Sequence, residues 1–328
     1  MELHPAISFL GGLVIILLGA ELVLRGAARI AVMLGVKPMI IGLTVVSVGT
    51  SMPELAVGIT AVSDNIGSLA VGNIAGTNIL NILFILGLSA AIKPLPLQLL
   101  SIRFDVPVMI ASAVALIIMA LDGVLSRLEG ILLVLAAVVY TIALVRLSKR
   151  ETAAMRKEYE EEFSSKALLE KNGGRSSIIN NTIILIAGIG FSILGANLLV
   201  AGSVEIALNL GVSDAVIGLT IVAIGTSAPE LATTLVATAK NDRDVAVGNL
   251  IGSSIANILV ILGITCIASP NGIDVSREIL WFDLPLAAAV AIVCYPVFRS
   301  GRMVSRREGI GFVIAYLIYL STLIFLRA

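Results

Sequence analysis

The sequence predicts an all-α membrane protein with ten transmembrane helices arranged as two inverted five-helix repeats. Three observations lead to this fold class. The 328 residues are 58% hydrophobic and only 13% charged, and their mean hydropathy of +1.06 lies outside the range of ordinary soluble domains. Charges, glycines and prolines divide the chain into ten apolar segments. The second half of the chain also repeats motifs of the first half at one constant offset.

A membrane-spanning helix needs about 20 mostly apolar residues. By this rule we expect five spans in the first half, at residues 6–25, 38–62, 68–91, 104–121 and 128–148. We expect five more in the second half, at residues 180–202, 213–239, 245–268, 282–298 and 308–326. The first span is not interpreted as a cleaved leader, because its Gly19 and Gly26 match Gly195 and Gly202 in the sixth span.

The domain organisation follows from this division. Residues 1–148 form the first repeat, residues 149–180 a polar linker, and residues 181–328 the second repeat. Five spans is an odd number, so the second repeat must enter the membrane from the opposite side. With both termini outside, all but three of the 22 Lys and Arg residues fall in inner loops or the linker. Because positive loops stay inside, we expect a multi-pass protein of the cell membrane with a cytoplasmic linker.

One motif dominates the repeat. Residues 41–56 read IGLTVVSVGTSMPELA, and residues 217–232 read IGLTIVAIGTSAPELA. Each copy places a glutamate, Glu54 or Glu230, inside a strongly apolar segment. A charged side chain at the centre of a bilayer costs about 2.5–3.5 kcal/mol on insertion scales, so a purely structural role is disfavoured. Two such residues at matching positions predict one cation shared between the two halves.

Each of the two motifs also contains a proline, which predicts a broken helix. Pro53 and Pro229 lack an N–H group, and their rings clash with the carbonyl four residues earlier. Lipid offers no hydrogen bonds, so the freed carbonyls need other partners, and a dehydrated cation is one. We expect these carbonyls near Ser47, Gly49 and Thr50, and near Ala223, Gly225 and Thr226. The alternative is a simple kink whose carbonyls are satisfied by neighbouring helices.

The span after each motif carries a second polar layer. Residues 72–87 read GNIAGTNILNILFILG and residues 248–263 read GNLIGSSIANILVILG. Their glycines are spaced for close helix packing. Polar residues follow at i, i+4 and i+8 on one helix face: Asn73, Thr77 and Asn81, matched by Asn249, Ser253 and Asn257. Such stripes either bridge helices or, facing two glutamates, ligate or orient the ligands of a cation, which is the interpretation we favour.

The available ligands restrict the ion. His4 is the one histidine and lies near a terminus, and Cys266 and Cys294 form no CxxC pair. Carboxylate, amide, hydroxyl and carbonyl oxygens remain, which suit calcium or sodium. Two glutamates balance one Ca2+ or two Na+, so alternative occupancy would constitute exchange. The sequence shows no basic stripe with interleaved aromatics, which disfavours nucleic-acid binding. It also shows no pair of nucleophile and base, so we expect no enzyme and no cofactor.

The paired GTSxPE motifs, each followed by a GNxxGS/T stretch, resemble the two alpha repeats of the sodium/calcium exchanger family, in its compact prokaryotic form. The resemblance implies an electrogenic antiporter that exchanges Na+ for Ca2+ by alternating access. It also implies a calcium site of Glu54, Glu230, Thr50 and Thr226. Flanking sodium sites would use Ser47, Ser51, Thr77, Ala223, Ser227 and Ser253, with Asn81 and Asn257 at the middle.

Three alternatives to sodium-driven exchange stay open. Some relatives carry aspartate at one of the positions of Asn81 and Asn257, and asparagine at both positions disfavours potassium coupling. A proton-coupled exchanger and a cation channel are the other two. The expected partners are Na+, Ca2+ and the lipid bilayer, and the sequence is compatible with a monomer. The first and sixth spans are glycine-bearing and poor in ligands, so we expect them to slide past the others, with Glu21 and Asn197 as interfacial or helix-packing groups.

Overall fold

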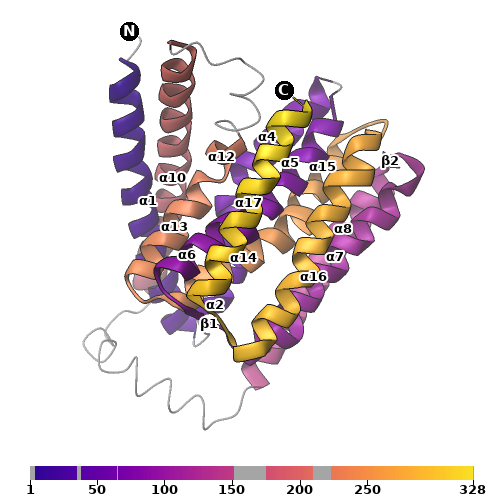
Figure 1. Cartoon of the computed structure of the whole chain (residues 1–328). Helices are drawn as coiled ribbons and strands as arrows, with labels where there is room; N and C mark the ends of the chain where they lie inside the picture. The colour runs from indigo at the N-terminus through magenta and orange to yellow at the C-terminus, as the bar shows by residue number, and fades with distance from the viewer. Residues whose placement is uncertain (1–3, 35–37, 65, 151–174, 210–222, 328) are drawn as a thin grey trace.

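A computed structural model of the chain describes residues 4–34, 38–64, 66–150, 175–209 and 223–327, and these are almost entirely helical (Figure 1). The helices of the first half are α1 Pro5–Leu34, α2 Pro38–Ile41, η1 Gly42–Val46, α3 Ser47–Thr50, α4 Met52–Ser63, α5 Ser68–Ile79, η2 Leu80–Leu86, α6 Gly87–Ile92, η3 Ser101–Asp105, α7 Val106–Met119, η4 Ala120–Asp122 and α8 Arg127–Arg150. Those of the second half are α10 Arg175–Asn209, α12 Ala223–Thr226, α13 Ala228–Ala239, α14 Arg243–Ala256, η6 Asn257–Leu262, α15 Gly263–Ala268, η7 Ile279–Asp283, α16 Leu284–Gly301 and α17 Arg306–Arg327. The η4 segment is a 3-10 helix and the other η segments are π-helical.

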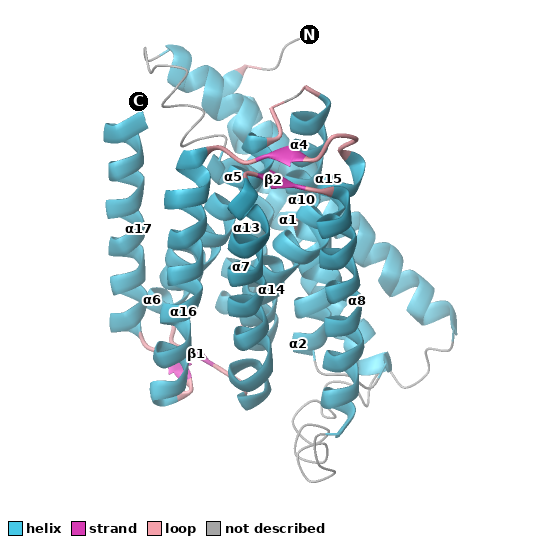
Figure 2. Ribbon diagram, turned by 90° about the vertical axis from the view of Figure 1, so that its right-hand side faces the viewer, coloured by secondary structure: helices cyan, strands magenta, loops and turns pink. Residues whose placement is uncertain are grey.

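Two short antiparallel strand pairs connect the halves at opposite ends of the molecule (Figure 2). Strand β1 (Leu95–Pro96) pairs with β4 (Met303–Val304), with Leu95 opposite Val304. Strand β2 (Val124–Leu125) pairs with β3 (Ile273–Asp274), with Leu125 opposite Ile273. Each pair therefore joins a loop of the first half to a loop of the second half.

Seven of the described helices are long and apolar enough to cross a membrane, or eight if the bent pair Met39–Thr50 and Met52–Ser63 is one span. The chain is therefore a multi-pass membrane protein. The ten-span count stays a prediction, because the start of the expected span 213–239 lies outside the described residues and α17 is not among the seven. The expected linker also lies mostly outside them; α8 extends to Arg150, and α10 begins at Arg175 rather than at residue 180.

The local structure of the two halves is repeated. The helix breaks at Ser51 and again at Ser227, with nearly the same backbone angles: φ −83° and ψ 11° at Ser51, φ −89° and ψ 8° at Ser227. The π-helical segments η2 and η6 also occupy matching positions. This agreement follows from the sequence repeat, because the same prolines and glycines impose the same local conformation.

Helices α1 and α10 lie side by side at one edge of the molecule (Figure 1), and glycines set their contact. A Cβ atom at Gly12, Gly19 or Gly26 would lie 2.4, 2.5 or 2.8 Å from atoms of Leu199, Ser192 or Leu185 respectively. The residue numbers on α10 fall as those on α1 rise, so the helices are antiparallel. No side chain longer than hydrogen fits at these glycines, and the two backbones touch.

Helices α5, η2, α14 and η6 form the core of the molecule. The span Ser68–Ile92 is 72% buried within the protein, and Arg243–Ala268 is 83% buried. Close packing again depends on glycine, because a Cβ atom at Gly252 would lie 2.6 Å from the Cα atom of Leu43 in η1. The predicted packing role of this glycine is confirmed. The core therefore holds its polar stripes away from lipid.

Candidate cation site

The two broken helices deliver the glutamates. Because Pro53 has no N–H group, it leaves the carbonyl of Gly49 without its usual helical partner. The helix bends by 40° at the break between α3 and α4. Glu54 and Glu230 lie in the first turns of α4 and α13, where the partial positive charge of the helix N-terminus favours a carboxylate. The predicted breaks are confirmed in both copies.

The motifs of the two halves meet through reciprocal contacts. The Ser51 hydroxyl donates to Oε1 of Glu230 at 3.1 Å, and the Ser227 hydroxyl donates to Oε1 of Glu54 at 3.4 Å. Both glutamates are completely buried. These hydrogen bonds are long for a hydroxyl and a carboxylate, so the serines position the acids without neutralising them. The structure thus brings together the two acids that the repeat predicted to share a site.

Several oxygens around the acids have no hydrogen-bond partner in the described part of the chain. They are Oε2 of Glu54, Oε2 of Glu230, Oδ1 of Asn81, Oδ1 of Asn257 and Oγ of Ser253, all buried. A buried polar oxygen without a partner costs about 1–3 kcal/mol, and an ionised one costs more. Hard cations accept such oxygens as ligands. The oxygen set therefore fits Na+ or Ca2+ as bound substrate.

The other expected ligands lie in the same region, with one correction. Thr77 and Asn81 are buried on α5 and η2, and Ser253 and Asn257 are buried on α14 and at the start of η6. Ala223 begins α12, and Thr226 ends it. The expectation that the carbonyl of Ser47 is freed was wrong. It accepts the N–H of Ser51 at 3.1 Å, because the helix breaks only after this bond is made.

Thr50 and Asn249 connect the two halves. The Thr50 hydroxyl lies 3.3 Å from the carbonyl oxygen of Ser47 and 3.4 Å from Oδ1 of Asn249. The amide nitrogen of Asn249 in turn lies 3.4 Å from Oγ1 of Thr234. The Ser47 hydroxyl donates to the carbonyl of Thr44 at 3.1 Å, within its own helix. Of these two hydroxyls, only that of Thr50 therefore contacts the polar stripe of the second half.

Sequence reasoning missed Asn78, Thr233 and Thr234. Asn78 donates to the carbonyl of Ser254 at 3.1 Å and accepts the amide N–H of Asn257 at 3.0 Å, so it holds Asn257 in place. Its signal was an asparagine in an apolar span, one position away from the stripe. The two threonines are fully buried beside the site, but the first repeat has Val57 and Gly58 at their positions. The repeat therefore gave no signal for them.

Two broken helices from opposed halves, meeting at paired buried acids, define a membrane transporter for cations. The family model described as "Sodium/calcium exchanger protein" matches residues 4–146 and 180–325. The putative antiporter CaxA of Alkalimonas amylolytica is 35% identical over 97% of this chain and 98% of its own length. Sodium/calcium exchanger MaX1 of Methanosarcina acetivorans is 30% identical over 96% of this chain and 97% of its own length.

The fold is similar to that of a solved exchanger. The structure of the sodium-calcium exchanger NCX_Mj soaked with 10 mM Na+ and zero Ca2+ matches with a TM-score of 0.81 and 29% identity, over 97% of this chain and 98% of that chain. The chain belongs to the sodium/calcium exchanger family. This membership confirms the family that the paired motifs indicated.

Proposed function

We propose that this protein is a sodium/calcium antiporter that exchanges Na+ for Ca2+ electrogenically by alternating access. The observation that carries the proposal is the pair of buried glutamates whose free oxygens face no described hydrogen-bond donor. Their combined charge of about −2 matches one Ca2+ or two Na+. Occupancy by one ion type excludes the other by charge repulsion in a site of low dielectric constant, and this exclusion couples the two fluxes.

Individual ligands follow the motif positions. Glu54 and Glu230 bind Ca2+ together with the backbone oxygens of Thr50 and Thr226. Sodium ions bind on either side, near Ser47, Ser51 and Thr77 in one half and Ala223, Ser227 and Ser253 in the other. Asn81 and Asn257 complete the middle of the site. The burial of these asparagines, and the free oxygens of Asn81, Asn257 and Ser253, support this assignment. The ions are substrates, and no cofactor takes part.

The proposed topology has ten spans in two inverted repeats, residues 1–148 and 181–328, with residues 149–180 as a cytoplasmic linker. The matched breaks at Ser51 and Ser227 and the antiparallel contact of α1 and α10 support inversion. The described ends of the chain lie at the same end of the molecule (Figure 2), as expected when both termini are outside. The β1–β4 pair then lies on the cytoplasmic side.

Alternating access uses a movement of α1 and α10 against the core. An apolar cavity of about 530 Å3 lies beside α10, lined among others by Gly49, Ile186, Ile189, Leu259 and Val260. A side chain that faces an apolar cavity on one side has few contacts to break when it moves. The cavity therefore gives α10 room to move next to the broken helix α3–α4.

The test is ion flux in liposomes that contain only this protein. An inward Ca2+ flux should follow an outward Na+ gradient, and an imposed voltage should change its rate. Gradients of K+ or H+ alone should not drive it. Flux that requires K+ would identify a potassium-coupled exchanger, and flux that follows pH alone a proton-coupled one. Conductance without any counter-ion would identify a channel. Any of these three results would overturn the proposal.

A further inference from the structure

Three exposed arginines line one cavity that contains none of the expected cation ligands. Arg103, Arg299 and Arg302 line a space of about 340 Å3 together with Leu99, Ile102 and Tyr295. Arg103 belongs to η3, Arg299 to the last turn of α16, and Arg302 follows the end of α16. Three like charges gathered around one cavity repel each other unless an anion lies among them. The cavity therefore has the electrostatics of an anion site.

No described carboxylate neutralises this cluster. Among the described residues, the ion pairs are those of Glu21 with Arg25 and with Lys240, and none of these three residues lines the cavity. Asp105 is the acid closest in sequence to Arg103, but its two oxygens accept the hydroxyls of Ser101 at 2.7 Å and Tyr140 at 3.0 Å. An acid that is buried and doubly hydrogen-bonded elsewhere leaves the guanidinium groups free for an external partner.

The local backbone holds Arg302 at this place. Its φ angle of +50° is unusual for a residue other than glycine. Its carbonyl accepts the N–H of Leu97 at 2.8 Å, and the next two residues pair with β1. These hydrogen bonds fix the turn that carries the arginine. The position of Arg302 is thus set by the backbone and not by the flexibility of its side chain alone.

The cavity lies at the level of lipid head groups. It is found where the candidate span Ser101–Asp122 begins and the candidate span Ile279–Gly301 ends, at the end of the molecule marked by β1 and β4 (Figure 2). In the proposed topology this is the cytoplasmic side. Leu99, Ile102 and the ring of Tyr295 give it an apolar wall beside the arginines. A small soluble anion makes no favourable contact with an apolar wall, whereas the apolar part of a lipid does.

We propose that this cavity binds the phosphate of an anionic phospholipid. Guanidinium groups bind phosphate oxygens in pairs of parallel hydrogen bonds, and basic pockets between spanning helices on the cytoplasmic side suit anionic head groups. The apolar wall contacts the glycerol and the start of the acyl chains. The site does not depend on which ions the protein exchanges, so it can fail or hold separately from the proposed function.

The test compares two triple variants of equal charge. The first replaces Arg103, Arg299 and Arg302 with glutamine. The control makes the same change at Arg277, Arg306 and Arg307, which are exposed like the first three but do not line the cavity. Phosphatidylglycerol or phosphatidylcholine is added to detergent-purified protein, and bound lipid is counted by native mass spectrometry. We expect the wild type and the control to retain one phosphatidylglycerol in preference to phosphatidylcholine. The cavity variant should bind phosphatidylglycerol at least about tenfold more weakly, as expected from the loss of several charge-assisted hydrogen bonds.

Two outcomes would overturn the proposal. Equal lipid retention by the cavity variant and the control would show that the cavity does not bind the head group. Displacement of the lipid by millimolar glycerol phosphate or inorganic phosphate would assign the site to a soluble anion. If the triple variant does not fold, the single variant Arg299→Gln replaces it. The readout is then the rise in thermal unfolding temperature with phosphatidylglycerol, which should be smaller than in the wild type; an unchanged rise would contradict the site.

Discussion

The core helices and the α1–α10 pair are built on opposite principles. The core spans Ser68–Ile92 and Arg243–Ala268 are 72% and 83% buried within the protein, whereas Pro5–Met33 and Ile178–Ile206 are only 33% and 28% buried. The core carries four of the expected ligands, Thr77, Asn81, Ser253 and Asn257, all buried, and Asn78 holds Asn257 by a hydrogen bond of 3.0 Å. The pair carries glycines on its inner face and apolar side chains such as Leu18, 58% exposed, on its outer face.

This difference separates the task of holding an ion from the task of moving. Buried polar groups cost free energy unless each has a partner, so a polar core has few alternative arrangements. A contact of glycine against backbone has no directional side-chain bonds that a shift must break. The core is therefore the region that fixes the ions, and the pair is the region whose position can change. The predictions below test this division.

Glu54→Gln should have the largest effect. It replaces one of the two buried carboxylates by a neutral amide of the same size. Bound Ca2+ then loses one of its two negative partners, and the loss of one partner of a buried pair of opposite charges costs about 3–5 kcal/mol. We expect Ca2+ affinity to fall at least about a hundredfold and exchange to fall to background. The measurements are Ca2+ binding by isothermal calorimetry and flux in liposomes.

The matched control for this variant is Glu205→Gln, the same change at an exposed position on α10. Exchange by this control should equal that of the wild type. Normal flux in Glu54→Gln, with folding verified by gel filtration, would show that the buried acids do not hold the ion.

Gly188→Ala should have the next largest effect, on the pair. The added Cβ atom would lie 2.6 Å from the backbone nitrogen of Val23 on α1, and a backbone atom cannot turn aside as a side chain can. Overpacking of this kind costs about 1–3 kcal/mol, so we expect a lower thermal unfolding temperature and slower exchange. Ca2+ affinity should stay within a few-fold, because none of the expected ligands lies on α1 or α10.

Gly190→Ala provides the control on the same helix. A Cβ atom at Gly190 has no described atom within 4 Å, and alanine favours the helix over glycine. This variant should be as stable as the wild type or slightly more stable. Equal behaviour of the two glycine variants would contradict the close contact of α1 and α10.

The parts of the structure that the sequence predicted have local causes. Pro53 and Pro229 break their helices by their own chemistry, and the repeat of Glu54 as Glu230 identified both acids. Asn78 was missed because its role depends on which face of α5 meets Asn257 in the other half. Pattern alone does not fix that rotation. The carbonyl of Ser47 was assigned wrongly because the exact residue of the break decides whether its hydrogen bond survives.

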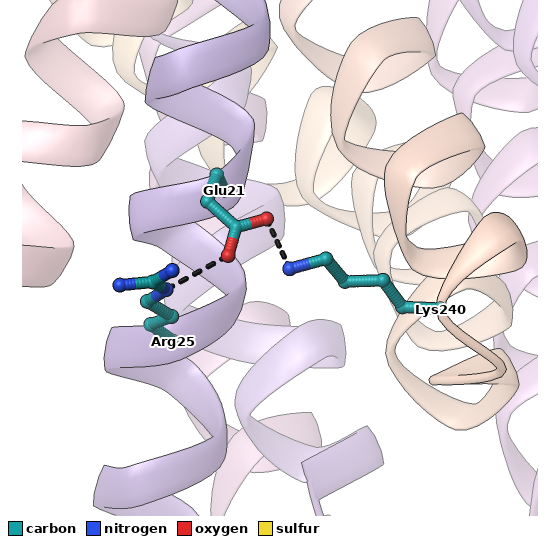
Figure 3. A network of polar contacts seen from close by, with 3 residues as sticks. All are labelled: Glu21, Arg25 and Lys240. Carbon is teal, nitrogen blue, oxygen red and sulfur yellow. Dashed lines mark hydrogen bonds and ion pairs between the residues drawn. The ribbon is translucent and has the colours of Figure 1, made fainter.

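Ion pairs between distant segments could also not be predicted from the sequence. Glu21 and Asn197, at equivalent positions of the two repeats, were both expected to be interfacial or helix-packing groups. Glu21 forms ion pairs with two basic side chains: Arg25 one turn along α1, at 2.7 Å, and Lys240 at the end of α13 (Figure 3). Neither the pairing nor its partner follows from spacing, because α1 and α13 meet only in the folded protein. This pair joins the α1–α10 pair to the rest of the molecule.

The ion pair of Glu21 and Lys240 has no counterpart at the equivalent positions of the other repeat. The residues at equivalent positions in the other halves are Asn197 for Glu21 and Asp64 for Lys240, and an amide and a carboxylate cannot form an ion pair. In a transporter built from inverted repeats, each repeat can adopt the conformation of the other, and this change closes one face of the protein and opens the other. A contact that exists on one side only therefore stabilises one of the two states. We expect it to stabilise the conformation described here.

Glu21→Gln should accordingly have the smallest effect and should change the balance of states. Partly exposed ion pairs contribute about 0–1 kcal/mol, which corresponds to a shift of at most about fivefold in the ratio of apparent Ca2+ affinities measured from the two sides of the membrane. High salt should reduce the difference between variant and wild type. Lys240→Gln should give the same shift, and the double variant should add little to either, because both single changes break one bond. Equal shifts from Glu205→Gln, or additive shifts in the double variant, would mean that the Glu21–Lys240 ion pair does not couple α1 and α10 to the rest of the protein.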